Sequence, residues 1–315
     1  MIPLKLLRIL VTGGAGFIGK HLVKSLIEKG NAVTIFDNFS NSSKKSVSDL
    51  IDIGAKVIEG DIIKYDKISD AVKDQEIVIH LAAKISVQES IRNPLETFQV
   101  NVNGTKNVLV ACEKNRVKKL IVASSAAVYG ESLPDIKLTE ESETNPISPY
   151  GESKLKMEQK IREFTSKHNI DCVILRFFNI YGIGQSDEYA GVISKFANCI
   201  KHNIPLTIYG NGNQTRDFVA IEDIVNLICR IVTLRLEKRF NVYNIGNEKS
   251  TIFDLANLMI ESSGKNIEII FKERKQGEII HSAASIDKAK ENLGYNPEIC
   301  LKKGIEKFLF HQNNI

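Results

Sequence analysis

The stretch Leu7–Thr12 (Leu-Arg-Ile-Leu-Val-Thr) runs directly into Gly13–Gly19 (Gly-Gly-Ala-Gly-Phe-Ile-Gly), and a helical pattern follows to about Lys29. A short run rich in β-branched residues is typical of a buried parallel strand. Three of the glycines that follow have the G-x-G-x-x-G spacing, which lets the backbone turn tightly and approach a pyrophosphate at the helix N-terminus. Because a strand precedes this loop and a helix follows it, the stretch predicts the start of a dinucleotide-binding βαβ unit.

An acidic residue ends the next predicted strand. Ala32–Phe36 runs into Asp37, eighteen residues beyond Gly19. A carboxylate there can accept hydrogen bonds from the adenosine ribose and would repel a 2′-phosphate, so the sequence favours NAD over NADP. The alternative is a simple turn residue at a strand end. The polar loop that follows would either close over the adenosine or be only a loop, and it contains Asn38, Asn41 and Ser42.

Strands and helices alternate through the first part of the chain. Further strands are predicted at Lys56–Glu59, Ile77–His80, Lys119–Ala123 and Asp171–Phe177, with long helices at Leu95–Asn115 and Tyr150–Asn169. This alternation predicts an α/β protein with a Rossmann-type doubly wound parallel sheet. Ligands of such sheets bind at the carboxyl ends of the strands. Asp37, Asp61, Ala82 and Ser125 all fall at that edge.

The pattern changes at about residue 180, where glycines separate loops and short strands. Helices are predicted at 191–202, 221–236, 251–263 and 286–293. We expect residues 1–179 to form an NAD-binding Rossmann domain that carries the catalytic residues. Residues 180–315 would form a smaller α/β lobe, mainly for substrate binding, threaded back against the first.

The stretch Pro149–Lys154 (Pro-Tyr-Gly-Glu-Ser-Lys) places Lys154 one helical turn after Tyr150. A phenol with a pKa of about 10 is a poor base at neutral pH, and a nearby ammonium group favours the phenolate. Tyr-x-x-x-Lys also occurs by chance as a surface pair on a helix. The predicted cofactor site elsewhere in the chain favours the catalytic interpretation.

Composition limits the classes of function. The chain has 315 residues and a small net charge of +4 from interleaved Lys and Glu, which does not argue for a nucleic-acid partner but would suit an anionic small ligand. The five cysteines are far apart, so we expect reduced thiols in a cytosolic protein and no metal site. The apolar start continues into the glycine loop without a cleavage site, and no apolar run reaches membrane-spanning length.

Taken together, these motifs make the chain resemble the extended short-chain dehydrogenase/reductases. Within them it is similar to the nucleotide-sugar 4-epimerases of the UDP-glucose/UDP-galactose type. The resemblance covers nearly the whole chain: Val11–Gly19, Asp37-Asn38, Gly60–Ile62, His80–Ala83, Asn101–Thr105, Ser124–Gly130, Tyr150–Lys154, Leu175–Gly182, Gly210–Asp223 and Gly277–Ser282.

The resemblance implies a mechanism and a catalytic set of Ser125, Tyr150 and Lys154. Ser125, rather than Ser124, would hydrogen-bond the sugar's 4-hydroxyl while the Tyr150 phenolate takes its proton. Lys154 would hold the nicotinamide ribose and depress the Tyr150 pKa. Hydride would pass from sugar C4 to NAD, and the 4-keto sugar would turn and take it back on the opposite face. The expected cofactor-binding residues are Gly13, Gly16, Phe17, Ile18, Asp37, Asn38, Asn41, Ser42, Asp61, Ile62, Leu81, Ala82, Ala83, Asn101, Tyr150 and Lys154.

The resemblance also implies a UDP-sugar substrate. Arg216 matches the family's diphosphate arginine, and a second cation is expected at Lys275 or Arg274. Ser282 matches a gatekeeper that is tyrosine in enzymes confined to non-acetylated sugars, so a serine implies that UDP-GlcNAc and UDP-GalNAc are also turned over; the alternative is an ordinary loop serine. The expected substrate-binding residues are Ser125, Asn179, Val192, Thr207, Tyr209, Arg216, Arg274, Lys275, Glu278 and Ser282.

Two absences argue against related reactions. Where the similar 4,6-dehydratases have an Asp-Glu pair and the UDP-glucuronate decarboxylases a Glu, this chain has Ala126 and Ala127. Methyl groups cannot transfer protons. Another nucleotide-sugar enzyme, such as a dehydratase, decarboxylase or reductase, or a non-catalytic NAD-binding sensor, remains the alternative. The family further implies a homodimer through the helices near 95–115 and 150–169.

Overall fold

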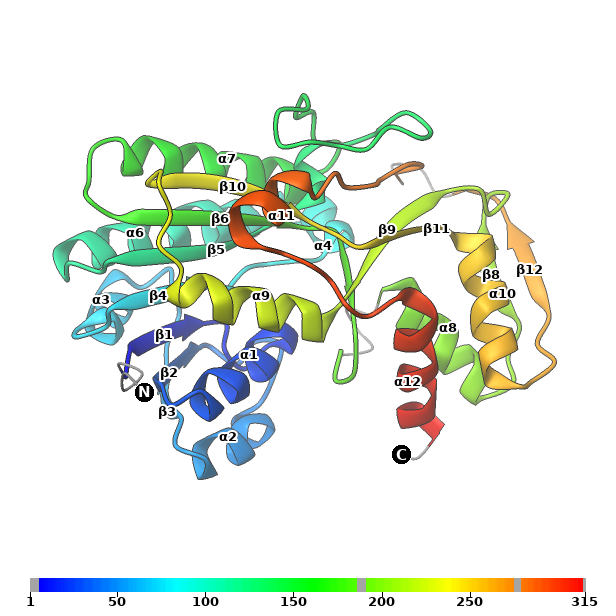
Figure 1. Cartoon of the computed structure of the whole chain (residues 1–315), viewed down its shortest axis with the longest axis horizontal. Helices are drawn as coiled ribbons and strands as arrows, with labels where there is room; N and C mark the ends of the chain where they lie inside the picture. The colour runs from blue at the N-terminus through cyan, green and yellow to red at the C-terminus, as the bar shows by residue number, and fades with distance from the viewer. Residues whose placement is uncertain (1–5, 186–190, 275–278, 314–315) are drawn as a thin grey trace. The chain divides into compact units, whose positions relative to one another are not determined.

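The computed structural model describes residues 6–185, 191–274 and 279–313, and the chain forms two compact units (Figure 1). The first consists of Met1–Val128, Ser148–Arg176 and Val225–Tyr243. The second consists of Tyr129–Ile147, Phe177–Ile224 and Asn244–Ile315. The expected boundary was at 179, and the main break follows Arg176. Residues 129–147 belong to the second unit, although they precede that boundary, and residues 225–243 belong to the first.

A seven-stranded sheet with the order β10-β6-β5-β4-β1-β2-β3 forms the centre of the first unit. Its strands are β1 (Arg8–Thr12), β2 (Ala32–Asp37), β3 (Lys56–Glu59), β4 (Ile77–His80), β5 (Lys119–Ser125), β6 (Asp171–Phe177) and β10 (Phe240–Ile245). The pairs β1–β2, β1–β4, β2–β3 and β4–β5 are parallel, which confirms the predicted doubly wound α/β fold. Residues 225–243 belong here because β10 is the edge strand next to β6.

Helices cover the strands of this sheet (Figure 1). They are α1 (Phe17–Glu28), α2 (Ser48–Asp52), α3 (Tyr65–Val72), α4 (Val87–Arg92), α5 (Pro94–Phe98), α6 (Thr105–Lys114), α7 (Pro149–Thr165) and α9 (Ile221–Thr233), with 3-10 turns η1 (Lys44–Val47) and η3 (Ala126–Val128). One buried cluster joins α3, α6 and α7 to the strands, with Val108, Leu120, Met157 and Ile174 among its members. One hydrophobic core therefore holds these three helices against the sheet.

The predicted single helix at 95–115 is three consecutive pieces. Between α5 and α6 lies the π-helical segment η2 (Gln99–Gly104). Wide π turns of this kind are rare and often occur at functional sites. The segment contains the buried Asn101, whose amide nitrogen lies 2.9 Å from both the Lys84 carbonyl and Ser153 Oγ. Helical periodicity alone did not reveal this interruption.

The second unit contains a three-stranded sheet, β11-β9-β7, and a two-stranded sheet, β12-β8. Its strands are β7 (Asn179–Tyr181), β8 (Leu206–Tyr209), β9 (Thr215–Ala220), β11 (Glu248–Thr251) and β12 (Ile269–Lys272). Its helices are α8 (Val192–Lys201), α10 (Ile252–Ser263), α11 (Asp287–Leu293) and α12 (Leu301–Asn313). A separate buried cluster, which includes Phe196, Leu255, Met259 and Ile305, holds this unit together.

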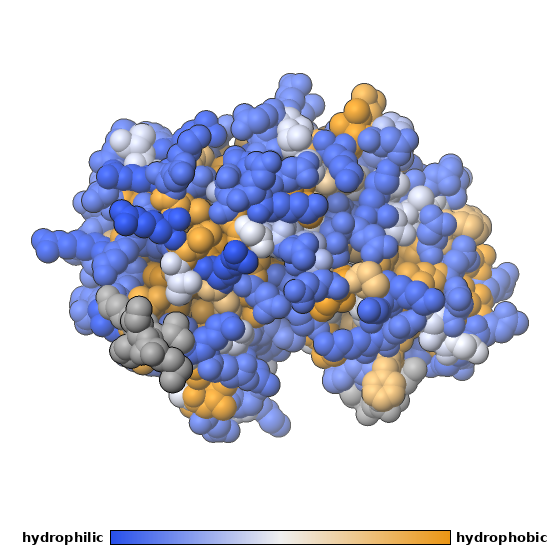
Figure 2. Space-filling view, viewed as in Figure 1, coloured by the Kyte–Doolittle hydropathy of each residue, from blue (hydrophilic) through white to orange (hydrophobic). Residues whose placement is uncertain are grey.

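Hydrophilic residues predominate on the face drawn in Figure 2, where apolar residues form small patches between them. Such scattered exposed apolar residues are normal for folded chains. Among the described residues, no helix combines the length and the apolar character that a membrane crossing requires.

Candidate active site

The glycine loop is shaped by close approaches of the backbone. Gly13 has a φ of +69°, and a side chain there would come within 2.7 Å of the Ala82 amide nitrogen. A Cβ on Gly19 would collide with the Gly13 carbonyl oxygen and lie 2.6 Å from Gly14 Cα. Helix α1 follows with Gly16 at its N-cap, no side-chain cap and no acidic residue in its first turn. An anion can therefore approach this helix N-terminus next to Phe17 and Ile18, as a pyrophosphate requires.

Asp37 ties the end of β2 to this loop. Its carboxylate accepts hydrogen bonds from the Ala15 amide at 3.0 Å and the Phe39 amide at 2.8 Å. Burial raises the Asp37 pKa, and the two backbone bonds oppose this. A carboxylate has about four acceptor positions, so two remain for other donors such as ribose hydroxyls.

A pocket of about 540 Å³ lies beside the carboxyl ends of β2 and β3, with Asn38 and Asp61 in its lining. Asn38 donates to Asp61 at 2.9 Å. Ile62 does not line the pocket: it is buried and packs against Gly104. Asn41 is exposed and Ser42 half-buried in the next turn. The other lining residues were not among the predicted cofactor-binding residues, and those with polar side chains are Ser40, Lys84, Glu96, Gln99 and Asn103.

The residues after β4 form the next part of this edge. Leu81, Ala82 and Ala83 are half-buried, and the Ala82 amide lies 3.3 Å from Thr12 Oγ1. Asn101 accepts from the Lys84 amide at 2.8 Å. Because Asn101 also contacts Ser153, its side chain connects this loop to α7.

The structure brings Ser125 and Tyr150 together. Ser148 caps α7 by accepting from the Gly151 amide at 3.1 Å, and Ser90 Oγ accepts from the Tyr150 amide at 3.1 Å. These bonds fix the first turn of the helix, where the buried Tyr150 side chain lies close enough to Ser125 for the serine hydroxyl to influence its pKa. Ser124 is instead bonded to Glu158, so the two adjacent serines have different partners.

Lys154 is buried one turn further along α7, and its Nζ donates to the Ala123 carbonyl at 3.0 Å. Burial lowers the Lys154 pKa to about 8, an effect that the nearby Glu158 carboxylate opposes. The neighbouring His80 is neutral, because burial and the Lys154 charge lower its pKa to about 3. At neutral pH, Lys154 is therefore the positive charge of this site.

The expected depression of the Tyr150 pKa is not produced by the chain's own groups. Burial raises the Tyr150 pKa above its usual value of 10.0, and the neighbouring Ser125 hydroxyl opposes this without offsetting it. The physical reason is that the loss of solvation outweighs the neighbouring groups. A second positive charge beside the phenol is needed for it to act as a base at neutral pH.

Apart from Ser125, the expected substrate residues that the structure describes lie in the second unit. Thr207 and Tyr209 are on β8, which pairs with β12, and Arg274 follows β12. Asn179 on β7 donates to the Asp217 carbonyl at 3.0 Å, next to Arg216 on β9. Val192 begins α8 and Ser282 is buried. Lys275 and Glu278 lie outside the described residues.

Glu131 holds the segment before Ser282, and no motif in the sequence indicated this role. Its carboxylate accepts from the Ile280 amide at 2.8 Å and the His281 amide at 2.9 Å. Arg216 also reaches this segment, with one guanidinium nitrogen 3.4 Å from the Ile280 carbonyl. The predicted gatekeeper and the predicted diphosphate arginine are therefore anchored to the same short segment.

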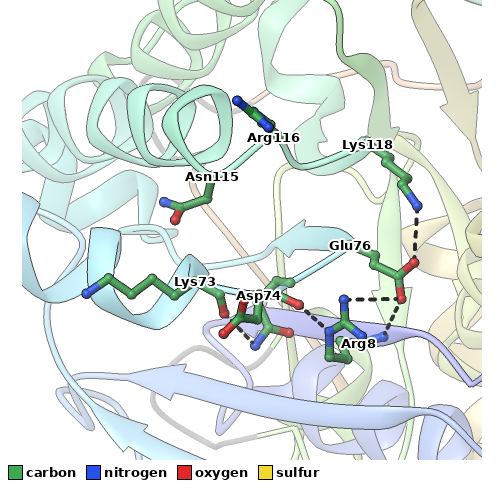
Figure 3. A pocket seen from close by; sticks show the side chains of 8 residues that line it. Arg8, Lys73, Asp74, Glu76, Asn115, Arg116 and Lys118 are labelled. Atoms are coloured by element: carbon green, nitrogen blue, oxygen red, sulfur yellow. Dashed lines mark hydrogen bonds and ion pairs between the residues drawn. The ribbon is translucent and has the colours of Figure 1, made fainter.

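A second pocket lies at the opposite, amino-terminal edge of the sheet (Figure 3). Here the Glu76 carboxylate accepts from Lys118 at 3.2 Å and lies 4.0 Å from an Arg8 guanidinium nitrogen, while Arg8 also donates to the Asp74 carbonyl. This pocket lies where β1, β4 and β5 begin, whereas ligands of doubly wound sheets bind at the carboxyl ends of the strands. We therefore place the active site at the carboxyl ends of the strands. No group of three or more metal-ligating side chains occurs in the described part of the chain.

The sequence profile of the NAD dependent epimerase/dehydratase family matches residues 9–246. The chain belongs to this family. It is 38% identical over 313 residues, 97% of its length and 98% of the relative, to a Methanocaldococcus jannaschii protein named provisionally as a UDP-glucose 4-epimerase. It is also 32% identical over 306 residues to UDP-glucuronic acid decarboxylase 4 of Arabidopsis thaliana, covering 96% of this chain and 67% of the relative.

Solved structures of epimerases in this family superpose closely on the chain. UDP-glucose 4-epimerase from Thermotoga maritima, with UDP-glucose, gives a TM-score of 0.91 at 31% identity and covers 98% of this chain and 99% of that one. UDP-N-acetylglucosamine 4-epimerase from Methanobrevibacter ruminantium, in complex with UDP-N-acetylmuramic acid, gives 0.90 at 32% identity and covers 98% of both chains. The chain is thus an enzyme of the NAD-dependent epimerase/dehydratase family, and its cofactor is NAD.

The close approach of the Gly13 and Gly14 backbone explains why Gly19 has no side chain. Replacing Gly19 with alanine is expected to destabilise the fold by about 1–3 kcal/mol, because the backbone of the loop has to move, and to reduce the NAD that copurifies with the protein. Thermal unfolding and the nucleotide content of the purified protein measure the two effects. Gly191→Ala, at the N-cap of α8, is the control because a Cβ there meets nothing within 4 Å and the φ of Gly191 is −63°. Equal nucleotide content in the two variants would contradict this account of the loop.

Proposed function

We propose that this enzyme catalyses NAD-dependent 4-epimerisation of UDP-hexoses, both UDP-Glc/UDP-Gal and UDP-GlcNAc/UDP-GalNAc. The observation that carries the proposal is the placement of Ser125 near the buried Tyr150 phenol, with Lys154 buried one turn further along α7. These three groups stand at the carboxyl end of β5, where a doubly wound sheet binds its ligands. The similar 4-epimerases of the family support the same assignment.

In the proposed mechanism, NAD when bound supplies the acceptor that takes the C4 hydrogen as hydride and gives it back. Tyr150 removes the proton of the C4 hydroxyl and later returns it, acting as base and then as acid. Ser125 hydrogen-bonds the same oxygen and keeps it within reach of the phenol. Lys154, protonated below about pH 8, favours the phenolate electrostatically.

The glycine loop and Asp37 fit NAD. The loop leaves the N-terminus of α1 accessible to a pyrophosphate, and the Asp37 carboxylate can accept from ribose hydroxyls but would repel a 2′-phosphate. We propose that the other predicted cofactor residues also bind NAD. In the second unit, Arg216 suits a bidentate phosphate contact, with Arg274 or Lys275 as the second cation.

Sugar specificity is proposed to depend on Ser282. Replacing Ser282 with tyrosine is expected to reduce kcat/KM for UDP-GlcNAc by about 100-fold relative to UDP-Glc, because a phenol ring would occupy the space of the 2-acetamido group. Coupled assays with both substrates give the ratio. Ser285→Tyr, three residues further along the chain, is the control. An unchanged ratio in Ser282→Tyr would show that this residue does not control the choice of sugar.

UDP-glucuronate decarboxylation is the second candidate, since a decarboxylase is 32% identical over 96% of this chain. Against it, Ala126 and Ala127 form the start of η3 directly after Ser125 and supply no acid or base. We expect no release of CO₂ from UDP-glucuronate. Release at a rate comparable to the turnover of UDP-hexoses would favour the decarboxylase.

We further propose a cytoplasmic homodimer. The cysteines of the chain are free thiols, which suits a reducing compartment. Exposed apolar side chains on the helices expected to pair include Leu95 and Val110, and Leu95 is 84% exposed. Sedimentation at several protein concentrations, with Leu95→Glu as the interface variant, tests the dimer.

Incubation of the purified protein with each of the four UDP-hexoses, without added NAD, tests the proposed reaction. Proton NMR is expected to show each sugar converting to its C4 epimer until a fixed ratio is reached, with no net NADH. A 4-keto or deoxygenated product would support a dehydratase. Binding of NAD with no turnover of any sugar would support a sensor.

A further inference from the structure

A buried ion pair lies behind the catalytic residues. Arg176 on β6 donates to both carboxylate oxygens of Glu158 on α7, at 3.0 Å from Nε and 2.7 Å from Nη2. Only 7% of the Arg176 side chain and 6% of the Glu158 side chain are exposed. Taking two charges out of water is costly, and apolar residues of similar size often stabilise a fold equally well. Stability alone therefore does not account for the pair.

The pair is linked to the catalytic residues through two neighbouring contacts. Ser124, which precedes Ser125 on β5, donates to Glu158 at 2.5 Å. One turn earlier on α7, Lys154 donates to the Ala123 carbonyl on the same strand at 3.0 Å. A shift of α7 along β5 would break both contacts and would move Tyr150 away from Ser125.

Glu158 also balances the buried charge. Lys154 and Arg176 are positive and Glu158 is negative, and Glu158 opposes the lowering of the Lys154 pKa by burial. His80 on β4 also faces Lys154 and is neutral. The buried Lys119, at the other end of β5, is bonded to carbonyl groups at the end of α9. The remaining charged groups on helices packed against α7 are not buried: Glu89, Arg92, Glu96, Lys106, Glu113 and Lys114.

We propose that Glu158 is a positioning residue for the reaction: held by Arg176 and Ser124, it fixes the register of α7 on β5 and offsets the positive charge of Lys154. The proposal rests on the proposed function, because it assigns Tyr150 and Lys154 to proton transfer. It extends the catalytic set to a pair of residues that do not touch the substrate.

Three variants separate charge from position. The pH profile of kcat/KM has an acid limb set by Tyr150 and an alkaline limb set by Lys154. Glu158→Gln removes the negative charge, so both limbs should move to lower pH by about one pH unit. Glu158→Asp keeps the charge but shortens the side chain, so kcat/KM should fall roughly tenfold with the limbs in place. Glu158→Gln combined with Arg176→Met restores the net charge and should return the limbs to their wild-type positions.

A second measurement does not depend on turnover. In the NAD-bound protein, the ultraviolet titration of Tyr150, obtained by subtracting the same titration of a Tyr150→Phe protein, should move to lower pH in Glu158→Gln and stay in place in Glu158→Asp. A wild-type protein that fails to interconvert UDP-hexoses would refute the proposed function, while this titration would still test the charge effect.

The proposal is overturned by either of two results. In one, Glu158→Gln lowers activity by the same factor at every pH and leaves the Tyr150 titration unchanged, as a purely structural residue would. In the other, Glu158→Asp is indistinguishable from wild type. If Glu158→Gln fails to fold, two variants still test the proposal. The double variant removes both charges of the ion pair, and Glu158→Asp removes neither.

Discussion

Replacing Tyr150 with phenylalanine is expected to reduce the interconversion of UDP-hexoses by about three orders of magnitude, the scale of a lost general base. The substitution removes one hydroxyl group from a buried side chain whose only described side-chain partner is Ser125. The ring keeps its packing, and the bond from the Tyr150 amide to Ser90 is unaffected. NAD content and thermal stability should therefore stay close to wild type.

Single-turnover assays on the NAD-containing variant measure the loss. Tyr243→Phe is a matched control, because Tyr243 is also fully buried and bonds a polar side chain, Asn241. We expect this control to retain wild-type turnover. Retained turnover in Tyr150→Phe itself would remove Tyr150 from the mechanism.

Replacing Lys154 with methionine is expected to reduce turnover by about 100-fold or more, because the phenolate loses the neighbouring positive charge. In the wild type, the charged form of Lys154 is present below its pKa of about 8. Turnover should therefore fall as the pH rises through 8, and Lys154→Met should lack this alkaline limb. Initial rates between pH 6 and 10 measure both effects.

Lys160→Met serves as the control, since Lys160 is an exposed residue on the same helix and such substitutions rarely change stability by more than about 0.5 kcal/mol. An alkaline limb that persists unchanged in Lys154→Met would assign that limb to another group.

The parts of this account that the sequence predicted depend on short, local patterns. The glycine loop, Asp37 and the Tyr150–Lys154 spacing each involve residues on one strand end or one helix turn, where backbone geometry is set by neighbours in the chain. The strand periodicity predicted the central sheet for the same reason. Asn101 was found by motif, but the π-helical segment that holds it was not, because a single widened turn leaves the helical pattern of apolar residues nearly intact.

The missed features depend on contacts between distant segments. Glu158 and Arg176 are eighteen residues apart on a helix and a strand, and no spacing rule joins them. Glu131 acts through the Ile280 and His281 amides, about 150 residues away. Residues 225–243 belong to the first unit because β10 pairs at the edge of its sheet. Tertiary packing determines this pairing, and local sequence propensity does not reveal it.

The most direct test of the central claim uses UDP-glucose and UDP-N-acetylglucosamine that carry deuterium at C4. If Tyr150 exchanges only the hydroxyl proton while the C4 hydrogen leaves and returns within one active site, the C4 epimer formed in ordinary water will retain deuterium at C4. Mass spectrometry and NMR of the product give the label directly. Deuterium replaced by solvent hydrogen, or products unchanged at C4, would contradict the account.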